Sequence, residues 1–391
     1  MKTMVCLSCQ FKGNDFLTEA KKLGNYIILI TSESMREQPW VRDAVDEIYF
    51  MPEIKASVWN LDFLVKGIGH LLKTRKIDSI VAFDDFDVEK AAHLRETFRI
   101  HGMGQTTYRY FRDKLAMRQK AKDSDILIPN FSAVFNNEEV NEFINSNPGP
   151  WVLKPRSEAS THGIKMIKNN EDLWRALEEL GDERINYLIE TFKEGDVYHV
   201  DSLISNGRMV FSNFSRYLKP PFEVTNKGGI FCTVNVGRRS KDAEELTKIN
   251  RKVMSSFSIQ EGVSHSEYIK GENGEFYFLE TSCRMAGAHI PTMLEAATGI
   301  NFWQEWARIE TARLNLEKYV VPVAERHYAG LLLALTTELK PDISPLINGN
   351  FYKEVFKDYH VGVVYRAENP DLLMRRIDEA MDYIRKNMLA C

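Results

Sequence analysis

The 391-residue sequence predicts a multidomain protein of mixed α/β (α+β) class, with a parallel sheet first and antiparallel strands after it. Three observations support this prediction. The length allows two or three domains. Strand and helix patterns alternate over residues 1–105, which favours a parallel sheet. Asn-Gly pairs at 206–207 and 273–274 separate runs rich in aromatic and branched residues, the strongest short-range signal for antiparallel hairpins.

Composition and charge narrow the class of protein. A hydrophobic content of 44% and a charged content of 27% are ordinary for a soluble globular protein. The net charge of −4 gives no reason to expect a nucleic-acid or membrane partner, and no apolar run approaches the roughly 18–20 residues that span a bilayer. Five cysteines, an odd and sparse set, predict reduced thiols and a cytoplasmic location.

The first region, residues 1–105, combines short apolar strands with amphipathic helices. A helix that starts near Asn14 ends at Gly24, a residue favoured just past helix ends. No G-x-G-x-x-G motif follows the first strand, so a dinucleotide-binding site is not expected. The expected elements are strands at 4–9, 26–31, 46–50 and 79–85 and helices at 14–24, 58–76 and 87–98.

The pattern changes near residue 105 and again near residue 310. The middle region contains a basic helix, hairpins and a small-residue loop at 157–163, and Asn170 is the expected N-cap of one helix. Its expected helices are 112–122, 170–180 and 247–257, and its expected strands are 151–155, 164–167, 187–192, 197–205, 208–217, 265–270 and 275–280. The last region predicts a small α+β unit with strands at 327–335 and 362–367 and a helix at 370–388.

The hairpin around 273–274 places two carboxylates together. A two-residue type I′ turn there pairs Glu267 with Glu280 on one face, with Cβ atoms about 5 Å apart, where like charges destabilise a sheet. A bound Mg²⁺ would offset that repulsion, whereas a plain surface hairpin would leave both charges in water. Ser282 and Arg284 follow on the same face, and a guanidinium suits a phosphate or a carboxylate.

Three further segments carry charged groups at strand or helix positions. Lys154 ends a strand before the loop 157–163, whose small residues let backbone N–H groups approach a phosphate. Glu190 ends another apolar strand, and Asp196 follows it; Lys114 lies in the basic helix. Taken singly, each segment is also compatible with an ordinary hairpin loop, a polar turn or a solvated helix face.

In this order, the segments resemble the ATP-grasp superfamily of ATP-dependent carboxylate–amine ligases, over about residues 105–310. The resemblance implies an ATP-grasp fold preceded by a Rossmann-like parallel-sheet domain. It divides the chain into an N-terminal domain at 1–105, an ATP-grasp domain at 106–310 with a lid subdomain at about 120–190, and a small C-terminal α+β domain at 311–391.

The resemblance implies an ATP site and assigns matching residues to it. The lysines that would contact the α- and β-phosphates are Lys114 and Lys154. The loop residues that would close over the triphosphate are Ser157, Ser160 and Thr161. The hinge at the adenine edge and the acid at the ribose hydroxyls would be Glu190, Thr191, Lys193 and Asp196.

The resemblance also implies Mg²⁺, as one or two ions with Mn²⁺ as an alternative, bound by Glu267, Glu280 and Ser282. The family's usual run is Glu-x-Asn-x-Arg, so Ser282 stands where an amide oxygen is expected and is a shorter, weaker ligand. Arg284 would meet the acyl phosphate and, with Lys154, take part in catalysis. The residues expected near the substrates are Arg216, Lys219, Arg284 and His289.

The expected activity follows from the resemblance. ATP would activate a carboxylate, such as that of an amino acid, as an acyl phosphate, and an amine would attack it with release of ADP and phosphate. The expected partners are these small molecules, in a homodimeric protein. The alternatives are a biotin carboxylase-like or formate-activating enzyme and, in another class, a non-catalytic ATP-binding regulatory protein, which the Ser282 departure favours.

Overall fold

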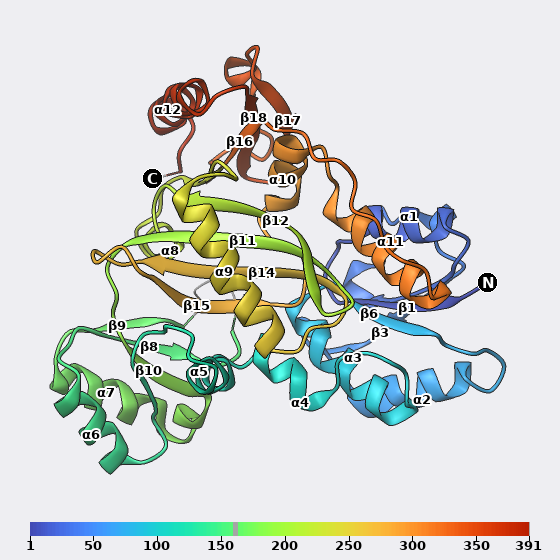
Figure 1. The fold of residues 1–391 in the computed structure, drawn as a ribbon, viewed down its shortest axis with the longest axis horizontal. Helices are drawn as coiled ribbons and strands as arrows, with labels where there is room; N and C mark the ends of the chain where they lie inside the picture. Colours follow the sequence, from blue (N-terminus) through green and yellow to red (C-terminus); the bar gives the residue numbers. More distant parts are fainter. Residues whose placement is uncertain (159–162, 391) are drawn as a thin grey trace.

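The structure, a computed structural model, describes residues 1–158 and 163–390, and their side chains except those of residues 226 and 227. Figure 1 shows a parallel sheet with its helices near the N-terminus, a large central sheet crossed by α9 (Lys241–Ser256), and a smaller sheet with α6 and α7. The C-terminal strands lie at the top of this view, where they continue the central sheet, and α12 (Pro370–Asn387) lies beside them.

The predicted parallel sheet is confirmed, with the strand order β3-β2-β1-β6. The predicted helix 58–76 is wrong at its start, because Val58–Trp59 is the short strand β5, paired with β4 (Glu53–Lys55). The helix begins after Asn60, whose side chain accepts a hydrogen bond from the N–H of Phe63. The other elements are β1 (Thr3–Ser8), α1 (Asn14–Lys22), β2 (Tyr26–Ser32), β3 (Glu47–Met51), α2 (Leu61–Leu71), β6 (Ser79–Ala82) and α3 (Asp85–Phe98).

A separate antiparallel sheet in the order β7-β10-β8-β9 carries two helices and is called the lid sheet below. The N-cap of α7 is Asn169 and not the predicted Asn170, because the Asn169 side chain accepts from the N–H of Asp172. The elements of the lid sheet are β7 (Phe131–Ala133), α6 (Asn137–Ser146), β8 (Trp151–Pro155), β9 (Lys165–Ile167), α7 (Asn170–Leu180) and β10 (Tyr187–Thr191).

The central sheet has eight strands in the order β15-β14-β11-β12-β13-β16-β18-β17. The C-terminal strands therefore extend it through the β13–β16 pair, and do not form a sheet of their own. The Asn206-Gly207 turn has positive φ at both residues, 51° and 68°, as a type I′ turn requires. The strands are β11 (Asp196–Ser205), β12 (Arg208–Tyr217), β13 (Phe231–Asn235), β14 (Gly262–Lys270), β15 (Phe276–Ser282), β16 (Tyr328–Leu335), β17 (Phe351–Glu354) and β18 (His360–Ala367).

The two faces of the central sheet differ in character. Aromatic side chains such as Tyr268 and Phe278 are fully buried between the sheet and α9, while carboxylates and histidines occupy the opposite face. The remaining helices are α4 (Gln105–Tyr108), α5 (Lys114–Asp123), α8 (Pro221–Lys227), α10 (Ile290–Thr298) and α11 (Phe302–Asn315). Within the part of the chain that the structure describes, no helix is both long and apolar enough to cross a membrane.

Candidate active site

The β14–β15 hairpin pairs Glu267 with Glu280, as predicted, but the predicted turn is wrong. Gly271 forms backbone hydrogen bonds with both Gly274 and Glu275, so the loop has three residues, and only Gly274 in it has a positive φ. A register shift between Glu267 and Tyr268 then restores the pairing of the two carboxylates. The bulge thus brings Glu267 and Glu280 to the same face of the sheet.

Each of these carboxylates has a partner of its own, which answers the repulsion between them. The Nζ of Lys114 lies 2.9 Å from Oε2 of Glu280, and the Tyr217 hydroxyl donates to Oε1 of Glu267 at 2.8 Å. Burial alone would raise the pKa of Glu280, but the cations of Lys114, Lys154 and Arg118 together outweigh burial and lower that pKa to about 2. The two carboxylates can therefore lie side by side, and together they offer oxygen ligands to a metal ion.

A buried ion cluster joins α5 to the lid sheet. Oε1 of Glu190 lies 2.7 Å from Nε of Arg118, and its Oε2 lies 2.7 Å from Nζ of Lys154, so one carboxylate forms ion pairs with both cations. Burial lowers the pKa of Lys154 to about 8. Arg118, which the sequence analysis missed, lies one helical turn after Lys114, a spacing that the sequence could have shown.

Cations and carboxylates balance in this region. Lys114, Arg118 and Lys154 contact Glu190 and Glu280, and Glu267 lines the same cavity as the two lysines. A metal ion held by Glu267 and Glu280 would leave Lys114 free to contact a phosphate group, in a region where burial strengthens electrostatic interactions.

Arg284 is held by an acid that the sequence analysis did not connect to it. Its Nε donates to Oδ2 of Asp85 at 2.8 Å, Nη2 contacts the same oxygen, and Nη1 donates to the carbonyl of Met285. Asp85 begins α3, which follows a strand ending in acids, and lies 199 residues away in the sequence. The carboxylate of Asp85 raises the pKa of Arg284 against the effect of burial.

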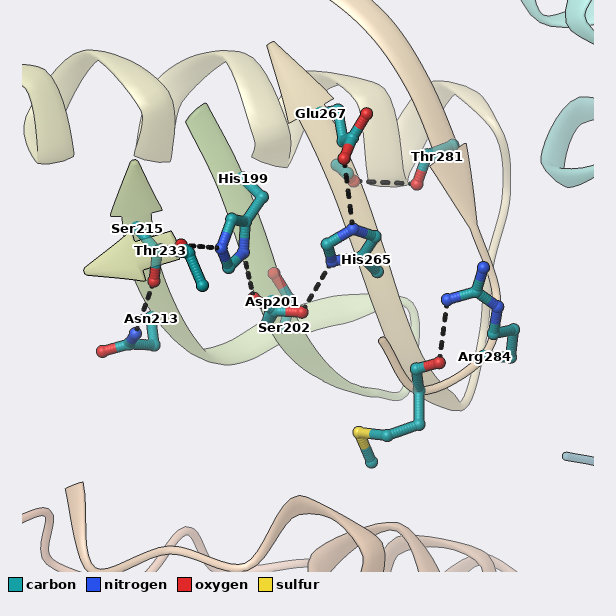
Figure 2. A network of polar contacts seen from close by, with 12 residues as sticks. His199, Asp201, Ser202, Asn213, Ser215, Thr233, His265, Glu267, Thr281 and Arg284 are labelled. Atoms are coloured by element: carbon teal, nitrogen blue, oxygen red, sulfur yellow. Dashed lines mark hydrogen bonds and ion pairs between the residues drawn. The ribbon is translucent and has the colours of Figure 1, made fainter. Parts of the chain in front are cut away.

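A polar network lies behind Glu267 (Figure 2). The two oxygens of Asp201 meet Nδ1 of His199 at 2.7 Å and Nδ1 of His265 at 2.8 Å, and Nε2 of His265 lies 3.6 Å from Glu267. These ligand atoms of His199, Asp201 and His265 lie within 4.8 Å of one another, close enough to share a metal ion, but hydrogen bonds already engage them. The network therefore serves as support for Glu267.

The sequence analysis missed this network, although its spacing was visible. His199 and Asp201 alternate along β11, and His265 and Glu267 alternate along β14, so each pair shares a face. The register then sets His199 opposite Glu267 and Asp201 opposite His265. That pairing required knowing which strands are neighbours.

Several predicted residues lie outside this cluster. Asp196 and Arg216 pair with each other at 3.2 Å on exposed parts of β11 and β12. Lys193 stacks on the ring of Tyr277, 4.6 Å from its centroid. Ser157, Lys219 and His289 are exposed, and Thr191 ends β10. Ser160 and Thr161 lie outside the described residues, so their predicted contacts are untested.

The fold resembles those of known enzymes. A solved L-amino acid ligase from Bacillus licheniformis matches with a TM-score of 0.77 and 13% identity, over 99% of this chain and 98% of that one. The biotin carboxylase domain of 2-oxoglutarate carboxylase from Hydrogenobacter thermophilus, a dimer solved with MgADP, ADP and bicarbonate, matches with a TM-score of 0.71 and 16% identity, over 97% and 89%.

A family model described as an ATP-grasp domain matches residues 147–292, a span that includes Lys154, Glu190, Glu267 and Glu280. Residues 147–292 are therefore similar to ATP-grasp domains, in agreement with the resemblance to the ATP-grasp superfamily. A curated relative in Bacillus subtilis, an L-arginine-specific L-amino acid ligase, is 25% identical over 274 residues, 68% of this chain. The match spans 65% of that relative's length, a little under two thirds.

Proposed function

We propose that this protein is an ATP-grasp carboxylate–amine ligase that uses ATP to activate a carboxylate as an acyl phosphate. The observation that carries the proposal is the convergence of Lys114, Lys154, Glu267 and Glu280 on one cavity. Two cations for phosphates and two carboxylates for a metal are the groups that phosphoryl transfer needs. The likeness to amino acid ligases and to a MgADP-bound carboxylase supports it.

The nucleotide would bind between the lid sheet and the central sheet. Lys114 and Lys154 would contact its phosphates, while β10 and the segment after it would border the adenine. The cavity measures about 140 Å³, below the roughly 300–1,000 Å³ of small-molecule sites. ATP binding therefore requires an outward movement of the lid sheet or of Phe222 and its neighbours, which line the cavity.

The residues present fit a magnesium ion. Glu267 and Glu280 offer adjacent carboxylate oxygens, the ligands that hard cations prefer, and Oγ of Ser282 is buried with no hydrogen-bond partner in the described chain. When bound there, Mg²⁺ would offset charge on the transferred phosphoryl group. Lys114 would then exchange its contact with Glu280 for one with a phosphate oxygen.

Arg284 would orient the carboxylate substrate. That carboxylate would attack the γ-phosphorus of ATP, the bond to the β-phosphate oxygen would break, and ADP would leave. An amine would then attack the acyl carbon, expelling phosphate and losing a proton. Asp85 already contacts the guanidinium of Arg284, so the substrate carboxylate would have to displace Asp85 or share the guanidinium with it. The contact with Asp85 also means that Arg284 is already oriented to bind a carboxylate.

A second cavity next to Arg284 would hold the amine. It has a volume of about 820 Å³ and begins at Gly287–His289, directly after the Arg284 loop. Asp15 and Glu295 lie in its wall and share contacts with Asn301, whereas Lys353 and Lys357 also line it. Acids and amines in one wall suit a zwitterion, so an amino acid is the proposed substrate class.

The test is ADP release from Mg-ATP, screened against pairs of amino acids and other small carboxylates with amines. Turnover that one acid–amine pair stimulates, and that Glu280→Gln abolishes, is the expected result. Turnover with bicarbonate and biotin and no amine would instead identify a carboxylase. If the protein binds ATP but no acid–amine pair stimulates ADP release, a regulatory protein is favoured. The presence of Ser282 where an amide is expected supports that alternative. Sedimentation of the same protein tests the expected homodimer.

A further inference from the structure

A second large cavity lies away from the site described above. It has a volume of about 860 Å³, within the usual range for small-molecule sites, and it opens between β13, α9 and α12. It shares no lining residue with the cavities assigned to the nucleotide and to the amine. We refer to it as the arginine groove, after Arg216, Arg238, Arg239 and Arg326 in its wall.

The groove is remote from the reacting groups. The strand register links Glu280 to Glu267, His199, Ser215 and Asn235, and Asn235 lines the groove. Four steps between strands of about 4.8 Å place Asn235 about 19 Å from Glu280 along the sheet. A ligand in the groove would thus occupy a separate site.

Three of its four arginines lack a carboxylate partner. Arg216 pairs with Asp196, but Arg238, Arg239 and Arg326 have no carboxylate within 4.0 Å among residues 1–158 and 163–390. Arg238 lies over the ring of Phe211, 4.4 Å from its centroid, and Glu325, which also lines the groove, pairs with His327 and Arg366. Burial and the nearby guanidinium of Arg326 both lower the pKa of Arg238. Unpaired guanidiniums held together in a chain of net charge −4 are what a bound anion would stabilise.

Two helix N-termini at the groove also favour an anion. Ser240, the N-cap of the 16-residue α9, and Pro370, the first residue of the 18-residue α12, both line the groove. Side-chain caps already bind the N–H groups of Ala243 and Leu372, and the other N–H groups of the first turn and the helix dipole favour negative charge. They reinforce the arginines.

A buried polar atom adds a different requirement. Asn213 is fully buried and lines the groove, and its Oδ1 has no hydrogen-bond partner among the described residues. Figure 2 shows this oxygen turned away from Ser215 and from the rest of the network. A buried carbonyl oxygen without a donor is costly, so a ligand that supplies a hydroxyl or an amino group would satisfy it.

We propose that the arginine groove binds a small organic anion with at least two negative charges, phosphate or carboxylate, and a hydroxyl or amino group that reaches Asn213. The guanidiniums of Arg238 and Arg326 hold its anionic groups, and the two helix N-termini add to the field. The groove joins α12 to the central sheet, so the ligand contacts both.

The test is calorimetric titration of the full chain with pyrophosphate and, separately, with citrate, which has a hydroxyl beside its carboxylates. The double variant Arg238→Gln/Arg326→Gln is expected to lower the affinity for the tighter-binding probe at least tenfold. The control variant Arg208→Gln/Arg251→Gln removes the same charge from exposed positions outside the groove and is expected to change that affinity less than twofold. The probe that binds more tightly shows whether phosphate or carboxylate is preferred.

Equal affinity in the groove variant and the wild type would overturn the proposal, as would an equal loss in the control variant or no binding of either probe at millimolar concentration. Thermal unfolding in chloride checks that each variant is folded. If the double variant does not fold, Arg326→Gln alone, at an exposed position, is expected to weaken the probe at least threefold, and an unchanged affinity there also rejects the groove.

Discussion

The two faces of the central sheet are built from the same strands but have different roles, because one packs in the core and the other carries the proposed active site. Tyr268 and Phe278 pair on the face toward α9 and are fully buried, while Glu267 and Glu280 pair on the opposite face. Glu267 and Tyr268 are neighbours on β14, where side chains alternate, and the register shift between the two pairs separates Phe278 from Glu280 although they are two residues apart. Substitutions on one face should therefore affect stability, and those on the other should affect chemistry.

The largest expected effect is on turnover, from Glu280→Gln. The substitution keeps the size of the side chain and removes the charge that would bind the metal, so activity should fall by roughly 100- to 1,000-fold. The protein should still fold, but its unfolding temperature should fall, because the substitution leaves the buried Lys114 without its carboxylate partner. ADP release and thermal unfolding measure the two quantities, and a fully active variant would remove the metal assignment.

The converse substitution is Phe278→Ala. Loss of a fully buried ring from the α9 face should lower the free energy of unfolding by about 3–5 kcal/mol, without weakening MgATP binding at low temperature. Leu279→Ala is the matched control, since Leu279 is partly exposed and lines the proposed nucleotide cavity. It should unfold less easily than Phe278→Ala and yet bind ATP more weakly. Chemical denaturation and nucleotide titration decide this, and equal behaviour of the two variants would break the comparison.

Lys154→Ala tests the phosphate contact proposed on the polar face. Removal of this buried cation should weaken ATP binding about tenfold or more, since a hydrogen bond between charged groups contributes about 1.5–3 kcal/mol. Lys165→Ala, on the neighbouring strand β9, removes a cation that is 42% exposed and pairs with Glu179, and should leave affinity unchanged. Equal affinity in Lys154→Ala and wild type would reject the phosphate contact.

The pH dependence of ATP binding follows from the same lysine. Its pKa is lowered to about 8 in the protein without nucleotide, so the charged form is lost as the pH rises through 8. ATP favours the charged form, and its affinity should therefore decline between pH 8 and 9.5, with proton uptake on binding. Lys154→Arg should show a flat profile in this range, because arginine stays protonated. A flat wild-type profile would contradict the assignment.

How far the sequence could predict this site depends on how local each contact is. The pairing of Glu267 with Glu280 lies within one hairpin and was predicted from a two-residue turn. The three-residue loop shifts the register by one residue, and the bulge shifts it back, so the predicted pair is still formed. The contact between Arg284 and Asp85 joins segments 199 residues apart, and no local pattern encodes it. The same holds for the β13–β16 pair, which merges the C-terminal strands into the central sheet.

The smallest expected effect concerns Ser282, whose buried Oγ lacks a partner in the described chain. Ser282→Asn would place an amide oxygen farther from the backbone, toward Glu280, and should lower the Mg²⁺ concentration that half-saturates turnover by about three- to tenfold, or about 0.7–1.4 kcal/mol. Ser282→Ala should raise it only if the hydroxyl itself binds metal. A Mg²⁺ titration of the three proteins separates the cases: no change in either variant would mean that the metal is held by the carboxylates alone, and that the polar face needs only its two charges.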